Sequence, residues 1–139
     1  MIRHSYDWLG LMVTEADPVA LPRLGGADFL ECHRDLTWNR AIIEAAGGEA
    51  VHYKLAAFTA FLVEQGIACI LLSIDLEDPG APALTAAAEA LGYFYSGIFP
   101  ESGRQGHDVL ELQFLNGITL DPSQIQLYQP SAKAILAYI

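Results

Sequence analysis

The sequence is poor in basic residues, and it contains no apolar run long enough to cross a bilayer. Only 7 Lys and Arg residues stand against 17 Asp and Glu residues, so the formal net charge is −10. Nucleic acids and anionic membranes bind clustered basic side chains, so neither is expected as a partner. The apolar run at residues 67–74 is far shorter than the roughly 20 residues of a membrane-spanning helix. No apolar leader is recognisable in residues 1–10, and we expect a cytoplasmic protein.

The sequence also lacks the short motifs of several enzyme classes. It has no Gly-x-Ser-x-Gly elbow, no Walker loop and no Cys-x-x-Cys pair. Its two cysteines, Cys32 and Cys69, fall in predicted strands, where buried and reduced thiols are expected. His33 and Asp35 lie near Cys32, but adjacent strand residues point to opposite faces of a sheet, so no metal site is expected.

The composition and length of the sequence predict one compact domain over residues 1–139. The composition is 53% hydrophobic and 17% charged, which favours a globular core over disorder. Residues 67–97 form the clearest unit. Residues 67–74 predict a strand with both faces covered, Asp78 and Pro79 predict a helix start, and Gly92 predicts the helix end before a further strand.

The remaining pattern predicts an α/β chain of the mixed α+β kind, with the order β-β-α-α-β-α-β-β-α. We expect a mixed five-stranded sheet with helices on both faces. The second strand should run parallel to residues 67–75, because a helical crossover joins them. The expected strands are residues 8–14, 27–33, 67–75, 93–99 and 109–115, and the expected helices are residues 37–46, 50–65, 78–91 and a C-terminal helix from residue 130.

The order of a helix, a buried strand, a helix that ends in residues 91–94 (LGYF) and two antiparallel strands resembles the C-terminal half of the GNAT (N-acetyltransferase) fold. Three further segments are residues 112–116 (LQFLN), 125–128 (IQLY) and 137–139 (AYI). They are similar to a GNAT-like C-terminal domain that follows an acyltransferase or an anti-sigma-factor-type ATPase in some larger bacterial proteins. The resemblance covers about residues 51–139, whereas residues 1–50 supply two strands and a short helix with looser agreement.

The resemblance implies a turn that binds the pyrophosphate of coenzyme A before the central helix, where N–H groups point at the anion. The nearest candidates are Gly47 and Gly48, with Lys54 further along the helix. The glycine spacing departs from the family pattern, and Glu49 would repel a phosphate. A helix–helix turn is the alternative interpretation of this loop.

The resemblance also implies a tyrosine general acid four residues before the helix-ending glycine, but Ala88 stands at that position and has no proton to give. Tyr93 and Tyr95 are expected to pack along the following strand. Glu31, on the second predicted strand, is the candidate general base, with a solvated surface carboxylate as the alternative.

Two functions follow as hypotheses. The first is a degenerate, non-catalytic GNAT-like module, with no cofactor expected, that acts in regulation or by binding a protein partner; a homodimer would cover its sheet edges. The second is an N-acyltransferase that uses acetyl-CoA or another acyl-CoA through a divergent loop. A small-molecule sensor that binds in the cleft beside residues 67–75 is a third possibility. Asp75, Glu77 and Asp78 follow this strand at its carboxyl end, where ligand sites form, and could bind a cation or an amine; the alternative is that Asp78 caps the helix and the other two are solvated.

Overall fold

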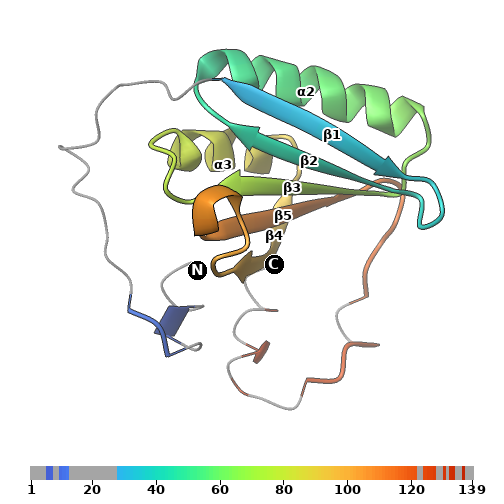
Figure 1. Ribbon diagram of the computed structural model, residues 1–139. Coiled ribbons are helices and arrows are strands. Elements are labelled where there is room, and N and C mark those ends of the chain that lie inside the picture. Colours follow the sequence, from blue (N-terminus) through green and yellow to red (C-terminus); the bar gives the residue numbers. More distant parts are fainter. Residues whose placement is uncertain are drawn as a thin grey trace.

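The computed structural model describes residues 6–7, 10–12, 28–121, 124–127, 130, 132–133 and 136. In this part of the chain a mixed five-stranded sheet, in the order β1-β2-β3-β5-β4, packs with two helices (Figure 1). The elements are β1 (Phe29–Asp35), β2 (Arg40–Ala46), α2 (Glu49–Glu64), β3 (Cys69–Asp75), α3 (Ala81–Ala90), β4 (Phe94–Phe99), the 3₁₀ turn η1 (Arg104–Gly106) and β5 (Val109–Leu115).

One parallel pair lies inside an otherwise antiparallel sheet. β2 and β3 are parallel, and α2 connects them, as a parallel connection requires. β1 pairs antiparallel with β2 at one edge, while β5 pairs antiparallel with both β3 and β4 at the other. The carboxyl ends of β2 and β3 therefore meet at one end of the sheet, next to the first residues of both helices.

The hydrophobic core lies between the sheet and the two helices. Side chains alternate along each strand, so that every second residue of β2, β3 and β5 faces the helices. Ile43, Leu72 and Leu112 are at most 1% exposed, and Leu55 of α2 and Leu84 of α3 are fully buried against them. The apolar area removed from water at this face is the main term that stabilises the fold.

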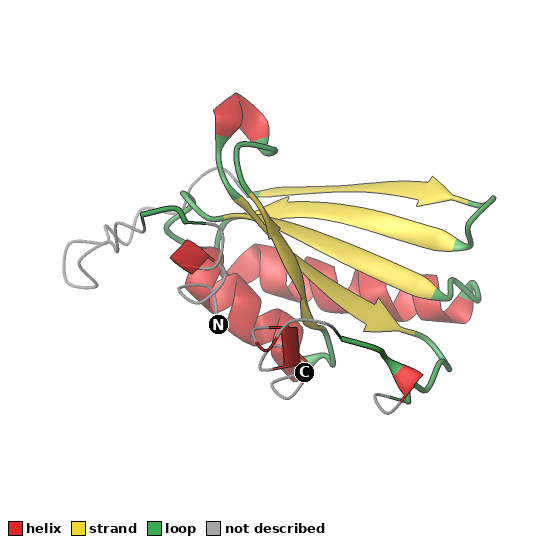
Figure 2. Cartoon of the chain, turned by 90° about the horizontal axis from the view of Figure 1, so that it is seen from below, coloured by secondary structure: helices red, strands yellow, loops and turns green. Residues whose placement is uncertain are grey.

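Both described helices cover the same face of the sheet, as Figure 2 shows. The expectation of helices on both faces is therefore not met by the part of the chain that the structure describes. The opposite face, which we call the open face, carries a row of aligned residues from four strands. From β1 to β5 these residues are Glu31, Glu44, Ser73 and Glu111.

The prediction of a helix over residues 37–46 is wrong, because this segment forms the tip of a hairpin and then strand β2. Ala41, Ile43 and Ala45 are buried, while Ile42 and Glu44 between them are not, which is the two-residue period of a strand. The apolar residues fit a helical spacing as well. The pairing with β1 and β3 on either side decided in favour of the strand.

Because residues 40–46 form strand β2, it is β2 that pairs parallel with β3. The predicted strand at residues 27–33 is present as β1, but it pairs with β2 and does not pair with β3, so the expected parallel partner was wrong. Of the strand predicted for residues 8–14, only residues 10–12 are described, and they form none. The predicted C-terminal helix lies mostly outside the described residues.

The rest of the prediction is confirmed, with small shifts of the element ends. α2, β3, β4 and β5 lie within two residues of their expected positions, and Gly66 and Gly92 adopt the positive φ expected after the helices. α3 begins later than predicted, after Gly80, and Asp78 accepts a hydrogen bond from the Gly80 N–H at 2.6 Å. No helix among the described residues is both long and apolar enough to cross a bilayer.

Candidate functional site

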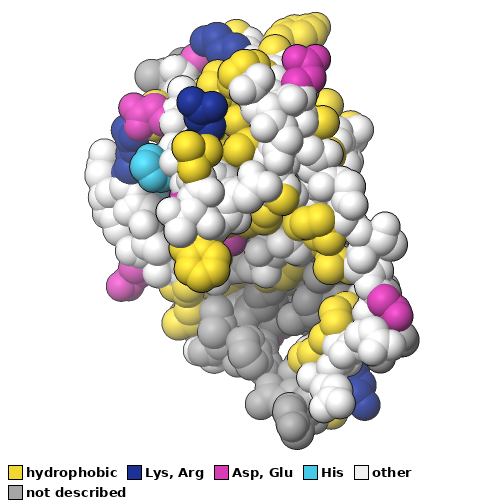
Figure 3. Space-filling model, turned by 90° about the vertical axis from the view of Figure 1, so that its right-hand side faces the viewer, with side chains coloured by type: hydrophobic (Ala, Val, Ile, Leu, Met, Phe, Trp, Pro, Cys, Tyr) yellow, Lys and Arg dark blue, Asp and Glu magenta, His cyan; other side chains and the backbone are white. Residues whose placement is uncertain are grey.

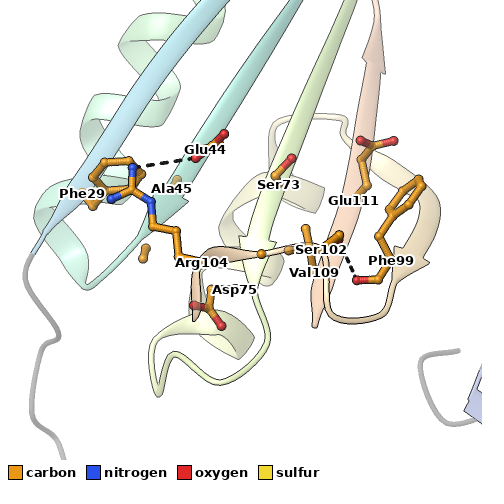
Figure 4. A pocket seen from close by; sticks show the side chains of 12 residues that line it. Phe29, Glu44, Ala45, Ser73, Asp75, Phe99, Ser102, Arg104, Val109 and Glu111 are labelled. Carbon is orange, nitrogen blue, oxygen red and sulfur yellow. Dashed lines mark hydrogen bonds and ion pairs between the residues drawn. The ribbon is translucent and has the colours of Figure 1, made fainter. Parts of the chain in front are cut away.

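A pocket of about 380 Å³ opens on the open face, at the carboxyl ends of β2 and β3 (Figure 4). Its floor is formed by side chains of three neighbouring strands, and residues 102–104 of the loop between β4 and β5 lie across it. The lining combines carboxylates, a serine and aromatic rings, including Glu44, Ser73, Asp75, Glu111, Phe29 and Phe99. A pocket with apolar walls and a few polar groups suits a small organic ligand.

Arg104 spans one side of this pocket. Its guanidinium lies 3.9 Å from the centroid of the Phe29 ring, and its Nη2 is 3.3 Å from Glu31 Oε2 and 3.9 Å from Glu44 Oε2. All three charged side chains are more than half exposed, so solvent screens the ion pairs and each contributes little to stability. These contacts orient the Arg104 side chain but do not hold it rigidly in place.

The structure places Glu31, the candidate base, at the rim of this arrangement. Its side chain is 69% exposed and faces Arg104, and it does not line the pocket itself. A carboxylate paired with a guanidinium in water is a poor match for the task of accepting a proton from a bound amine. The role of Glu31 as a base therefore remains a prediction, with a less favourable position than the sequence suggested.

Glu111 is better placed for proton transfer. It lies on β5 within the pocket lining, and burial raises the pKa of its carboxyl group, although the Ser96 hydroxyl donates to Glu111 Oε1 at 3.2 Å and acts in the opposite direction. A carboxyl group with a raised pKa accepts protons more readily near neutral pH. The alternation of residues 109–115 already predicts that Glu111 is on the solvated face; that signal could have marked it as a candidate.

A second polar contact holds the loop that crosses the pocket. His107 Nδ1 lies 2.7 Å from Asp75 Oδ2, and His107 Nε2 lies 3.5 Å from Glu77 Oε2. The hydrogen bond with Asp75 raises the pKa of His107. Asp75 Oδ1 also accepts from the Glu77 N–H. Asp75 and Glu77 thus hold the β4–β5 loop against the end of β3. The pocket lies beside residues 67–75, where the sequence led us to expect a ligand site.

The loop before α2 contains the candidate phosphate-binding glycines. Gly47 has φ = +114°, and a Cβ there would lie 2.7 Å from Asp28 Oδ1, so only glycine fits. The Gly48 N–H donates to the same Asp28 oxygen at 3.2 Å. A carboxylate of the chain itself therefore occupies the N-terminus of α2, the position at which a helix offers N–H groups to an anion.

The other residues around this helix start do not add positive charge. Glu49 is exposed in the first turn of α2, whereas Lys54 lies further along on the exposed face of the helix. A Cβ on Gly80 would collide with the carbonyl oxygen of Gly47, so the loops that precede α2 and α3 are in contact. The structure brings Gly47 and Gly48 together at the helix N-terminus but leaves Lys54 away from them.

The residues on the helix-covered face have structural roles. Thr59 donates to the Leu55 carbonyl at 2.8 Å and accepts from the Tyr93 hydroxyl at 2.8 Å. Burial raises the pKa of Tyr93 to about 12, so this phenol stays protonated. Ala88, at the position of the expected general acid, is fully buried in the core. Tyr93 and Tyr95 were expected to pack along the following strand, and both are buried, Tyr95 on β4 and Tyr93 directly before it.

Within the described ranges, no group of three His, Cys, Asp or Glu side chains is arranged to hold a metal ion. Cys32 packs against the core, whereas His33 shares the open face with Ile42, its partner in the register. The two side chains therefore point to opposite faces, as the sequence predicted. Cys32 and Cys69 are free and half-buried.

Comparison with known proteins gives a result at the level of the fold. No protein-family model matches this sequence, and no match is found among curated protein sequences. Solved structures of acetyltransferases do match. The ribosomal-protein-S18-alanine N-acetyltransferase from Escherichia coli superposes with a TM-score of 0.51 and 16% identity, over 73% of this chain and 67% of that chain.

Two further matches have TM-scores of 0.50 and 13% identity, each over 64% of this chain. They are the spermidine N-acetyltransferase from Vibrio cholerae, in complex with CoA and spermine, and a GNAT-family acetyltransferase from Bacillus anthracis. This chain covers 57% and 58% of them, so it spans a little over half to two thirds of the length of these three proteins. The chain has a GNAT-like fold.

Proposed function

We propose that this protein is a degenerate GNAT-like domain that acts as a regulatory or interaction module in the cytoplasm, without using acetyl-CoA. The observation that carries the proposal is the hydrogen bond from the Gly48 N–H to Asp28 Oδ1 at 3.2 Å. The pyrophosphate of coenzyme A would have to displace this carboxylate from the N-terminus of α2. It would also approach Glu49, which is exposed in the first turn, and both carboxylates repel it.

Titration calorimetry with acetyl-CoA tests this proposal. We expect no heat of binding for the natural sequence at millimolar ligand, because the anion site is occupied from within. Micromolar binding that is lost in a Gly48→Glu variant would overturn the proposal. The variant Asp28→Asn is the matched comparison, since it keeps the shape of the side chain and removes its charge.

The alternative is an acyl-CoA-dependent N-acyltransferase, and the pocket on the open face is the observation that favours it. The pocket begins at Ala45 and Ala46, directly before the glycine loop, and contains Glu111 with its raised pKa. An amine bound there would attack the thioester carbonyl, forming the C–N bond as the C–S bond breaks. Glu111 would take the proton from the amine, and the thiolate would leave as free coenzyme A after protonation.

In this alternative, Gly47, Gly48 and Lys54 would contact the phosphates, and a bound acyl-CoA would be required. The spermidine N-acetyltransferase from Vibrio cholerae was solved with CoA and spermine, which supports a polyamine as the first acceptor to test. Release of free thiol from acetyl-CoA in the presence of spermidine measures the reaction. Turnover that falls by about 100-fold in Glu111→Gln would favour the enzyme; absence of turnover and of binding together would exclude it.

A further inference from the structure

Helix α2 has an apolar surface on the side that faces away from the sheet. Its buried side is formed by Val51, Leu55, Thr59 and Leu62. On the other side, Tyr53 is 71% exposed and Phe61 is 46% exposed, although helices on the surface of a monomer normally present polar residues there. Large exposed aromatic side chains on a helix face are typical of protein–protein interfaces.

The exposed residues of α2 are arranged symmetrically about Ala57. Tyr53 and Phe61 lie four residues before and four residues after it, and a helix of 3.6 residues per turn places all three on one face. Ala50 and Glu64 lie seven residues before and after it on the same face. All five residues are exposed. Alanine at the centre leaves room for a second helix to approach closely.

We infer that this face binds the same face of a second copy of the chain, with the two α2 helices antiparallel about a two-fold axis at Ala57. A two-fold axis brings residue i of one copy opposite residue j of the other, and j opposite i. Tyr53 of each copy would then stack against Phe61 of the other, and the two Ala57 side chains would meet at the axis. This arrangement buries all the large apolar side chains of the face.

The charges on the same face are complementary in this arrangement. Glu64 of one copy lies opposite Ala50 of the other, beside Lys54 one turn along, so each Glu64 meets a lysine. It also lies near the positive, N-terminal end of the other helix, and antiparallel helix dipoles attract. In a parallel arrangement Glu64 would meet Glu64, and like charges would repel.

The β1–β2 hairpin lies beside the C-terminal end of the helix and also carries exposed apolar side chains. Asn39 Nδ2 donates to the Gly66 carbonyl at 3.2 Å and so holds the β1–β2 hairpin beside this end of α2. The hairpin carries Leu36 and Trp38, which are 76% and 74% exposed. Figure 3 views the molecule from this end and shows hydrophobic side chains at its surface.

The size of this contact indicates a reversible dimer. α2 has 16 residues and is about 24 Å long, so the contact between two such helices is short compared with the interfaces of permanent dimers, and a weak association is expected. We expect a dissociation constant in the micromolar range. Asp28 and Gly48, on which the proposed function rests, take no part in this interface, so a failure of the dimer would leave the proposed function unaffected.

Sedimentation over about 1 to 200 micromolar protein tests the dimer directly. The natural sequence should pass from monomer to dimer in this range, and Ala57→Arg should remain monomeric, because two like charges would meet at the axis. Ala86→Arg, on the exposed side of α3, is the matched control and should still dimerise. Circular dichroism establishes that each variant is folded. A natural sequence that stays monomeric throughout, or a dimer that survives Ala57→Arg, would overturn the inference.

A charge exchange tests the orientation of the helices. Lys54→Glu and Glu64→Lys should each raise the dissociation constant by about 3- to 10-fold, and the double variant should restore it. The two residues are ten positions apart on one rigid helix, so they cannot pair within a copy, and restoration requires contact between copies. Failure of the double variant to recover would exclude the antiparallel arrangement.

A cross-link tests the position of the axis. Facing helices with an alanine contact lie about 8 Å apart, which brings the Cα atoms at the axis within the range of a disulfide. Ala57→Cys should form a disulfide-linked dimer under mild oxidation, whereas Ala86→Cys and the natural sequence should not. A cross-link of equal yield in the Ala86→Cys control would contradict the proposed surface.

Discussion

The two faces of the sheet differ in almost every physical respect, although they are formed by neighbouring residues of the same strands. On the helix-covered face, Ile43, Leu72 and Leu112 are at most 1% exposed and belong to the hydrophobic core. On the open face, the adjacent residues Glu44, Ser73 and Glu111 line a pocket. The residues that stabilise the fold therefore lie on one face, and the residues of the candidate site lie on the other. Substitutions in the pocket can thus occur without a large loss of stability.

The largest expected effect comes from removing volume on the helix-covered face. Leu72→Ala should lower the free energy of unfolding by about 3 kcal/mol, within the range of 2–5 kcal/mol for a fully buried leucine, because it leaves a cavity. Its neighbour Leu71 is only half-buried on the open face, and Leu71→Ala should cost less than about 1.5 kcal/mol. Urea unfolding measures both. Equal losses would show that the open face is also packed.

A smaller effect is expected from the buried hydrogen bond between Tyr93 and Thr59. Tyr93→Phe removes the donor and should cost about 1 kcal/mol, because the ring stays in place while Thr59 keeps its own bond to Leu55. Tyr53→Phe, at a position that is 71% exposed, is the control and should cost almost nothing in the monomer. Thermal unfolding at low protein concentration compares them, and a neutral Tyr93→Phe would show that the bond adds no net stability.

The raised pKa of Glu111 predicts a pH dependence that comes from the open face. Its folded-state pKa lies above the ordinary value of 4.5, so the folded state binds this proton more tightly than the unfolded state does. The stabilisation is present at low pH, and it is lost as the pH rises through the window between the unfolded and the folded pKa. Glu111→Gln should remove this decline and raise the free energy of unfolding at neutral pH.

Unfolding curves at several pH values measure the effect of Glu111. Gln113→Asn, on the same strand and face, is the control, and it should keep the profile of the natural sequence. His107 also has a raised pKa, but its contribution is present below the ordinary value of 6.5 and is lost only at higher pH. A Glu111→Gln profile with an unchanged decline in the acidic window would contradict the assignment.

The smallest effect is expected at Arg104. Arg104→Ala should change the free energy of unfolding by less than about 1 kcal/mol, because its partners Glu31 and Glu44 are exposed and solvent screens the pairs. Arg104→Lys keeps the charge but loses the flat guanidinium over Phe29, so it separates the ring contact from the ion pairs. A loss of several kcal/mol in either variant would mean that the open face contributes to stability after all.

The sequence was sufficient for the elements whose pattern is local. The alternation of residues 109–115 predicted β5 with its wet face, and the apolar run at residues 67–74 predicted β3. Gly66 and Gly92 were expected after the two helices and have positive φ there. The sequence was not sufficient for residues 40–46, because Ile42 and Ile43 are compatible with the periodicity of a helix and with that of a strand. That choice depends on pairing with strands on both sides, which no local pattern contains.

The site was predicted less well than the fold, because its contacts join distant residues. Gly47 and Gly48 were recognised as a candidate loop from the sequence, but the carboxylate that occupies it belongs to Asp28, 20 residues earlier. Glu31 was selected for its strand and proved to face Arg104, 73 residues away. Glu111 was missed, and the ligand site was expected only as a cleft beside residues 67–75, since the pocket forms only when the ends of β2, β3 and β5 and the β4–β5 loop meet.

By itself, then, the sequence determined most elements of a GNAT-like fold and the face on which each of these strands is apolar. Hydrophobic periodicity and glycine conformation act within a few residues, so they can be read from the chain. Only the tertiary structure decided that residues 40–46 are a strand, that both described helices share one face, and that Asp28 occupies the start of α2. These outcomes depend on hydrogen bonds and packing between segments that are distant in sequence, where many partners compete.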